Sequence, residues 1–512
     1  MNLLLKFKQK YIILLLIIFF IVNLLFLSSF PFIHSDEAWL SGLSRTYLET
    51  GAMNYTFFDI YPTAHHTMKM VFILIQSAFI KILGYSIFSV RLISLFFSTC
   101  SLYIFYKILK HYTDDIFVIL LTTILLSFNL QFILISHIAR QEAPLIFLFL
   151  LAYYIILKNY KHNNILLASI LGIGIGIHPN IFFLALSLGL IYIFKIINKE
   201  KKIIDLVKLI TFTIGYFAIY IFTTFNINGN FFPEYNSYGE TLGVANGIIN
   251  KIQGFYYFYY KLFHEISGTY FLVDLKFDYL LLIITGSLYI YLVKKKKIDL
   301  NASYSQLFLI AINIGILILG RYNQISVIFP IVFLYLSFAI FIIKLNFNKN
   351  YIYSFLILLV LFQTYNSIDF IKNTQNENYK SYLNEFSIIP DDANILANLN
   401  LEYKFKDKLF DYRNLYYLKD NDLTIKEYIK NNNIKYIVWY EEMDYYYRNA
   451  PKWDIIYGEL YYYNDMKDFL INNCEIEKEF ENKTYAMRIA KYVNTYPWKI
   501  TIYKVKANIK WC

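Results

Sequence analysis

The chain has 512 residues, of which 57% are hydrophobic and only 17% are charged. The apolar residues form repeated long runs, which a water-soluble domain could not bury, so we predict a polytopic membrane protein. A net charge of +11 would suggest nucleic-acid binding in a soluble protein. Here the lysines lie in short loops between apolar runs, where they set orientation, so we expect no nucleic-acid partner.

The first apolar run, YIILLLIIFFIVNLLFLSSF, follows Lys6, Lys8 and Lys10. It is longer than the apolar region of a signal peptide and no small-residue cleavage site follows, so we predict an uncleaved first span. The three lysines place the N-terminus in the cytoplasm, which predicts that Asp36 and Glu37 emerge on the outer face.

Residues 68–84 are the one apolar run that we expect to lie along the outer surface. The run is short and contains two lysines, Lys69 and Lys81, which permits a position along the surface. If it were counted as a span, Lys107 and Lys110 would lie outside, against the charge rule. About eleven spans result, each near the length needed to cross a bilayer. After the first, they lie near residues 88–110, 116–135, 144–157, 165–178, 180–197, 205–225, 277–293, 304–319, 326–343 and 351–371. The four lysines at 294–297 give the strongest cytoplasmic signal.

The composition changes after residue 372, where no further run is long enough to span. We therefore predict a membrane domain over 1–372, with an outer loop at 31–87, and an extracytoplasmic α/β domain over 373–512. In the second domain, ANILANL, KYIVWY and KITIYKV have strand character, whereas DLTIKEYIKNNN and YNDMKDFLINN have helical character. Its tyrosine triplets, 445–447 and 461–463, could stack on sugar rings, but we favour a packed or interfacial face.

The three cysteines, Cys100, Cys474 and Cys512, are too few and too scattered for a disulfide framework or a zinc site. Cys474 and Cys512 could still pair. No cofactor is implied by any motif. Paired carboxylates and outer histidines could bind a divalent metal, although no metal-ligand spacing requires one.

Polar residues gather at the predicted outer ends of the spans. Each alone has an ordinary explanation, such as a solvated carboxylate or an arginine that reaches lipid phosphate, but their convergence on one face favours a site. Arg91 lies inside an apolar run and needs an anionic partner, either a carboxylate such as Glu37 or a ligand phosphate. Arg140 and Glu142 could simply pair with each other. The set comprises His34, Asp36, Glu37, His65, His66, Arg91, Arg140, Glu142, His178 and Arg321.

Five stretches resemble, in order and spacing, the dolichyl-phosphate-mannose protein mannosyltransferase family, which is glycosyltransferase family 39-like. It belongs to the GT-C group of membrane glycosyltransferases, which includes the aminoarabinose transferases acting on lipid A. The resemblance covers roughly residues 1–370 and is strongest over the first 200. The stretches are DEAWLSGLSRTYLETG, YPTAHHTMK, ILGYSIFSVRLISLFFST, ISHIARQEAPLIFLFLL and GIGIGIHPN.

The resemblance implies an inverting hexosyl- or pentosyltransferase that moves a sugar from a polyprenyl-phosphate donor to a protein, lipid or glycan acceptor on the outer face of the cell membrane. It implies that Asp36 is the catalytic base and Glu37 its neighbour. The donor phosphate would be bound by Arg91, Arg140, Arg321 and Lys69, and the substrates by Glu142, His65, His66, His178 and Tyr322. Many relatives carry Asp in place of Glu142, and HHTMK replaces a common Pro-Pro pair.

The chemistry needs the same residue types independently of the family. A carboxylate within hydrogen-bond reach can take the acceptor proton, and arginine or lysine stabilises the departing phosphate. The main alternative is a multi-spanning transporter or flippase of lipid-linked sugars, but the spans carry few midplane charges and no halves look duplicated. An oligosaccharyltransferase would need a Trp-Trp-Asp motif, which VWYEEMDYYY does not match.

Overall fold

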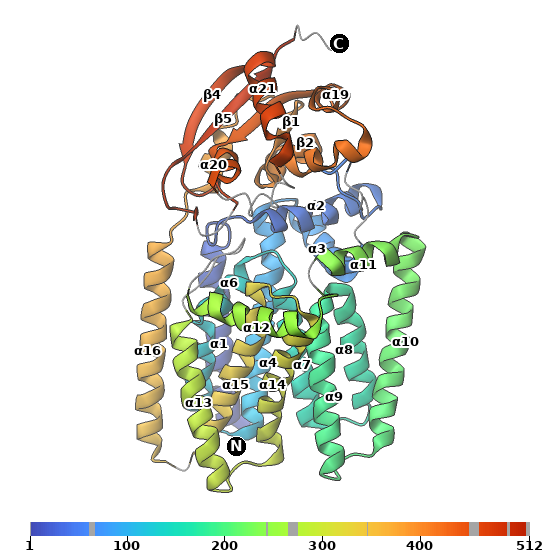
Figure 1. Ribbon diagram of the computed structural model, residues 1–512. Helices are drawn as coiled ribbons and strands as arrows, with labels where there is room; N and C mark the ends of the chain where they lie inside the picture. The colour runs from blue at the N-terminus through green and yellow to red at the C-terminus, as the bar shows by residue number, and fades with distance from the viewer. Residues whose placement is uncertain are drawn as a thin grey trace.

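The computed structural model describes residues 2–60, 67–241, 244–264, 275–345, 347–449, 460–488 and 492–507. The side chains of 2–9, 237–241 and 461 are also outside this description. A bundle of long helices carries a small domain with a β-sheet at one end (Figure 1). The predicted fold class, a polytopic helical membrane protein with a small C-terminal α/β domain, is confirmed.

The predicted spans coincide with helices of the bundle. By length and composition, 7 helices of the described residues could cross a membrane, or up to 8 if a bent pair is counted as one span. The predicted total of about eleven stays a prediction, because several remaining helices are shorter. The helices are α1 (Asn2–Phe26), α4 (Ile87–Tyr112), α5 (Ile116–Ser127), α6 (Leu130–His137), α7 (Glu142–Lys158), α8 (Asn163–Ile177), α9 (Phe182–Ile197), α10 (Ile203–Ile227), α13 (Lys276–Lys294), α14 (Leu300–Leu319), α15 (Ile328–Lys344) and α16 (Lys349–Asn373).

The bent pair, α5 and α6, turns by 64°. Asn129 caps α6 by accepting the Phe132 N–H at 3.0 Å, and its amide donates to Asp278 at 2.8 Å. The Phe128 carbonyl, exposed by the break, accepts the Ser367 hydroxyl of α16 at 2.5 Å. These bonds satisfy the backbone groups that a broken helix leaves inside an apolar bundle.

Shorter helices cover the end of the bundle that faces the sheet domain (Figure 1). α3 (Met70–Leu83) has 14 residues, which span only ~21 Å, less than the ~30 Å of a hydrocarbon core. This length agrees with the predicted surface position of 68–84. α2 (Ser35–Thr50) lies between α3 and the sheet domain. α11 (Phe231–Thr241) and α12 (Ile248–Phe263) lie between the predicted spans 205–225 and 277–293, where no helix was predicted.

The C-terminal domain holds a five-stranded mixed sheet in the order β2-β1-β3-β5-β4. The predicted strands are β1 (Asn394–Ala397), β3 (Ile434–Tyr440) and β5 (Trp498–Val505), and the predicted helices are α19 (Ile425–Asn431) and α21 (Tyr463–Asn473). β1 runs parallel to β2 and β3, whereas β5 runs antiparallel to β3 and β4. The sequence did not indicate β2 (Leu409–Asp411), β4 (Cys474–Asn482), α17 (Tyr379–Asn384), α18 (Glu402–Phe405) or α20 (Glu441–Asn449).

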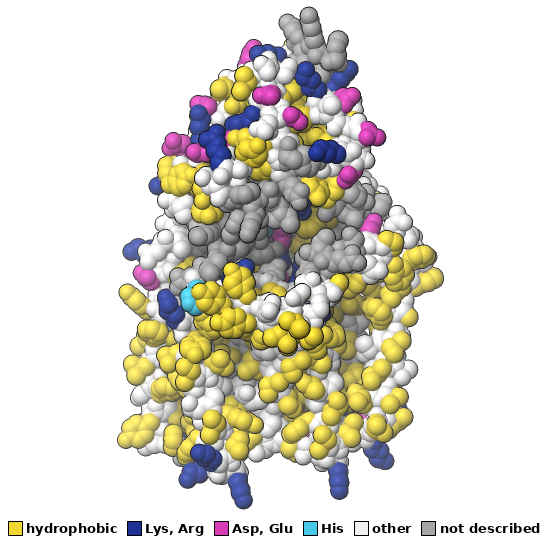
Figure 2. Space-filling model, viewed as in Figure 1, with side chains coloured by type: hydrophobic (Ala, Val, Ile, Leu, Met, Phe, Trp, Pro, Cys, Tyr) yellow, Lys and Arg dark blue, Asp and Glu magenta, His cyan; other side chains and the backbone are white. Residues whose placement is uncertain are grey.

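Side chains of the tyrosine triplets pack mainly within this domain. Tyr446 is buried, and Tyr447 stacks on Tyr463 with ring centroids 3.8 Å apart. Cys474 is a buried free thiol, and its possible partner Cys512 lies outside the described residues. In Figure 2 apolar side chains cover most of the visible face of the bundle, and lysines or arginines project from the end opposite the sheet domain.

Candidate active site

The N-terminus of α2 begins with a capping arrangement built by His34. Its Nδ1 accepts the Asp36 N–H at 3.1 Å, and its own N–H donates to Glu37 Oε1 at 3.0 Å. Because Nδ1 accepts a hydrogen bond, a neutral His34 ring carries its proton on Nε2. The two carboxylates lie in the first helical turn, where the helix dipole favours negative charge.

Glu37 and Arg91 form a fully buried, bidentate ion pair. Arg91 donates from Nε to Oε2 and from Nη2 to Oε1, both at 2.7 Å, and each side chain is 0% exposed. Glu37 Oε2 also accepts the Ala139 N–H at 2.9 Å. The pair therefore connects α2 to α4 and to the segment after α6. Arg91 has the anionic partner that the sequence predicted.

The remaining Arg91 donors meet backbone carbonyls. Nη1 lies 3.0 Å from the Leu27 and Pro31 oxygens, and Nη2 lies 3.3 Å from the Phe32 oxygen. A guanidinium has only five N–H donors, and these contacts occupy both ends of it. Arg91 thus contacts Glu37 and backbone carbonyls in this structure, and the phosphate-binding role of Arg91 and the catalytic role of Glu37 stay predictions.

Asp36, Arg140 and Glu142 form a second ionic group beside the first. Arg140 Nη1 donates to Asp36 Oδ2, while Nε and Nη2 donate to Glu142 at 3.3 and 3.2 Å. The Asp36 side chain is 24% exposed, whereas Arg140 and Glu142 are 3% and 2% exposed. Arg140 and Glu142 do pair, as considered from the sequence, but Arg140 also orients Asp36.

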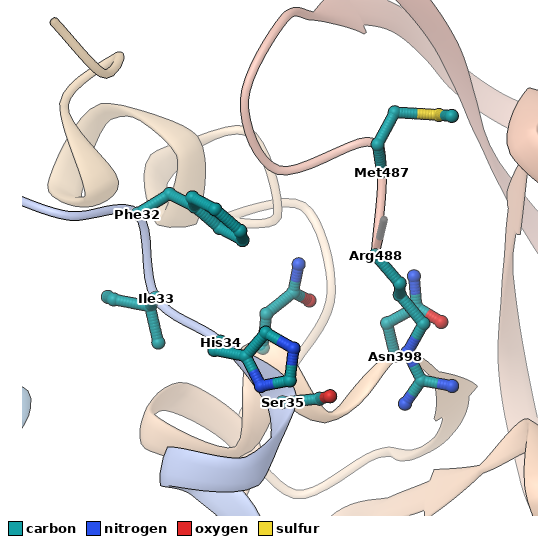
Figure 3. A pocket seen from close by; sticks show the side chains of 8 residues that line it. Phe32, Ile33, His34, Ser35, Asn398, Met487 and Arg488 are labelled. Atoms are coloured by element: carbon teal, nitrogen blue, oxygen red, sulfur yellow. The ribbon is translucent and has the colours of Figure 1, made fainter. Parts of the chain in front are cut away.

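A small pocket lies where the segment leading into α2 meets the C-terminal domain (Figure 3). His34 and Ser35 face Asn398, which follows β1, and Arg488, which follows β4. Arg488 is 8% exposed and is held by Asp411 at 3.0 Å. Residues of the C-terminal domain therefore line a pocket together with His34 and Ser35, the two residues that precede Asp36 in the chain.

A separate polar group contains His178 and Arg321. His178 Nδ1 accepts the Asn180 N–H at 3.0 Å, so a neutral ring carries its proton on Nε2. That Nε2 lies 3.0 Å from Arg321 Nη1, which is also a donor. This contact brings the Arg321 guanidinium next to His178.

The other predicted residues are placed as follows. Lys69 is buried at the end of the short helix η1 (Thr67–Lys69), which contacts α8. The Tyr322 hydroxyl donates to the Lys251 carbonyl of α12. His65 and His66 lie outside the described residues. Within the described ranges, no group of three or more His, Cys, Asp or Glu side chains could hold a metal ion.

The sequence missed the contributions of the C-terminal domain. Asn398 and Arg488 stand in loops without a recognisable motif, so only the fold brings them to the pocket. His34 was noticed but given no role, although a histidine two residues before Asp36 at a helix start is a possible cap.

Residues 65–227 match the family model described as dolichyl-phosphate-mannose-protein mannosyltransferase. The predicted family resemblance is confirmed. The predicted GT-C type of fold agrees with the structural comparison that follows.

A crystal structure of ArnT from Cupriavidus metallidurans bound to undecaprenyl phosphate superposes with a TM-score of 0.56 at 10% identity, covering 97% of this chain and 98% of that one. The apo ArnT structure from the same organism gives a TM-score of 0.41 at 10% identity, over 86% of this chain and 95% of that one. No curated protein shows a significant sequence match to the chain.

Proposed function

We propose that the chain transfers a sugar from a polyprenyl-phosphate donor to an acceptor on the outer face of the membrane, with Asp36 as general base. The observation that carries this proposal is the difference in exposure among the clustered carboxylates. The Asp36 side chain is 24% exposed, whereas those of Glu37 and Glu142 are 0% and 2% exposed. Only a base that substrate can reach can take its proton.

In the proposed step, the acceptor oxygen or nitrogen attacks the anomeric carbon while its proton moves to Asp36. The bond from the anomeric carbon to the phosphate oxygen breaks, and the polyprenyl phosphate leaves with that electron pair. Attack from the opposite side inverts the anomeric centre. Arg140 holds the carboxylate in one orientation, which favours a reactive geometry.

The donor phosphate is assigned to the His178 and Arg321 group. The two side chains lie 3.0 Å apart, and arginine suits phosphate because its donors form a planar fork. An apolar groove of about 420 Å³ between α12 and α14 is lined by Phe255 and by α14 residues as far as Leu317, four positions before Arg321. A polyprenyl chain in this groove would bring its phosphate toward Arg321.

The proposed orientation places the sheet domain outside the cell. Lysines 294–297 lie at the C-terminal end of α13, and the end of the bundle opposite the sheet domain carries projecting basic side chains (Figure 2). Cytoplasmic loops carry an excess of Lys and Arg. A lipid-linked donor suits an outer site, where nucleotide sugars are absent.

The test is the near-isosteric variant Asp36→Asn, assayed for transfer from a polyprenyl-phosphate sugar in membranes. We expect a loss of about a hundredfold or more in kcat, typical for a missing general base. Asp114→Asn, an exposed carboxylate at a loop, is the matched control and should keep the wild-type rate. Undiminished transfer by Asp36→Asn would refute the assigned role of Asp36. Sugar-lipid movement across the bilayer without transfer would instead support a flippase.

A further inference from the structure

α2 carries two ionic centres at different points along its length. Asp36 lies in its first turn, and Arg45 follows nine residues later, which places the two about 13 Å apart along the helix axis. A rigid helix transmits a shift at one end to the other. Whatever holds Arg45 therefore affects the position of Asp36.

Arg45 is held by residues from three segments. It donates to Glu402 at 3.1 Å and to Asp407 at 2.8 Å in the C-terminal domain, and to Thr56 at 3.0 Å in the loop after α2. It also pairs with Glu49 at 2.7 Å, and only 2% of its side chain is exposed. Removing one partner of such a buried contact is costly, because the other polar group is left buried without its hydrogen bond.

Glu402 is the buried member of the group on the domain side. Its side chain is 0% exposed, and its Oε2 atom has no hydrogen-bond partner among the described residues. Beside it, the Ser41 hydroxyl of α2 lies 3.2 Å from the Tyr85 hydroxyl and 3.0 Å from that of Tyr403. Polar contacts thus continue along α2 from Arg45 back toward Asp36.

Close packing at Gly42 supports the same contact independently. A Cβ atom there would lie 2.6 Å from the Phe57 ring and 3.7 Å from Glu402 Oε1. The Phe57 carbonyl in turn accepts N–H bonds from Asp411 and Asn414 of the C-terminal domain. The helix therefore packs closely on Phe57, which is itself bonded to the C-terminal domain.

We propose that Arg45 and Glu402 form an interdomain latch through which the C-terminal domain positions α2, and with it Asp36, for sugar transfer. The proposal rests on the proposed function of Asp36. In this account the C-terminal domain is part of the catalytic apparatus, and both latch members are positioning residues that do not touch substrate.

The test compares Arg45→Gln, Glu402→Ala and the control Lys408→Gln in the full-length protein, because Lys408 is a neighbouring exposed cation. Amide hydrogen exchange should rise in residues 35–44 for both latch variants, even though Glu402 lies outside that helix, while exchange in 87–112 stays unchanged. In the transfer assay, kcat should fall by about tenfold to a hundredfold with the donor KM within about twofold, as expected for misplacement by about 1 Å.

Arg45→Lys keeps the charge but loses the planar fork, so its kcat should lie between those of Arg45→Gln and wild type. If Arg45→Gln fails to fold, Arg45→Lys still tests the latch. Unchanged exchange in 35–44 for Glu402→Ala would overturn the latch. The two proposals fail separately. If Asp36→Asn keeps transfer, the proposed function falls while the exchange data still decide the latch. If Asp36→Asn abolishes transfer but the latch variants keep the wild-type kcat, the latch alone falls.

Discussion

Glu37 and Arg91 meet in a buried ion pair, with Arg91 Nε and Nη2 each 2.7 Å from a different carboxylate oxygen. Glu37 lies on α2 and Arg91 on α4, and the two residues are 54 positions apart in the sequence. Around it, Ala139 and the 27–32 segment supply the remaining hydrogen-bond partners. It fixes the start of α2 against the bundle, directly beside Asp36.

The first prediction concerns this pair. Glu37→Gln leaves the Arg91 cation without its counter-charge in an apolar environment, so the free energy of unfolding should fall by about 3–5 kcal/mol. The measurement is thermal unfolding in detergent, with Glu49→Gln, a 48% exposed carboxylate, as the comparison. A Glu37→Gln protein that unfolds at the wild-type temperature would contradict the structural role assigned here.

The second prediction separates two roles for Arg140. In the structure it bridges Asp36 and Glu142, whereas the family resemblance implies donor phosphate binding. Arg140→Lys cannot contact both carboxylates in the same planar geometry, so kcat should fall by about a hundredfold while the donor KM stays within about twofold. A raised donor KM with unchanged kcat would return Arg140 to phosphate binding. Steady-state kinetics with varied donor decides between them.

Much of the fold could be predicted because it follows from long apolar runs and from the sides on which lysines gather. The length of an apolar run does not by itself identify a span. Residues 68–84 are long enough to be counted as one, and only the distribution of lysines argued against it. α11 and α12 were missed because 226–264 contains polar and aromatic residues without a clear span. β4 was missed because CEIEKEFEN is highly charged, and such a pattern is ordinary for a sheet edge.

The candidate site was predicted as a set of residue types but not as a set of contacts. Asp36 and Arg140 could be placed on one face from topology, yet the sequence could not show that Arg140 contacts Asp36. Arg91 illustrates the same limit, because a phosphate or Glu37 would satisfy its charge equally well. The choice depends on packing between α2 and α4, which are distant in sequence and meet only in the folded chain.

The third prediction concerns the donor phosphate. Arg321→Gln removes one charged donor from the His178 and Arg321 group, and a charge-assisted hydrogen bond contributes about 1.5–3 kcal/mol. The affinity for undecaprenyl phosphate should therefore fall by about tenfold or more. Binding of undecaprenyl phosphate to protein in detergent measures this, with Lys297→Gln at the opposite end of the bundle as control. Equal affinities for Arg321→Gln and wild type would remove Arg321 from the phosphate site.

The fourth prediction concerns pH and the latch. Burial raises the pKa of Glu402 to about 8, with the carboxylates of Asp407 and Glu49 acting in the same direction and Arg45 against it. The tyrosines Tyr85, Tyr379 and Tyr403 also face this carboxyl group. An unfolded glutamate has a pKa of about 4.3. Between about pH 4.3 and pH 8, the Glu402 carboxyl group is therefore protonated in the folded protein but ionised in the unfolded chain.

A raised carboxyl pKa stabilises the fold at low pH, and this contribution is lost as pH rises toward about 8. Glu402→Gln mimics the protonated form and has no such loss. The melting temperature of Glu402→Gln should therefore exceed that of wild type by an amount that grows between about pH 4.3 and about pH 8 and levels off above it. Thermal unfolding of both proteins across that range checks the sign. A difference that is constant with pH would mean that Glu402 does not change protonation there.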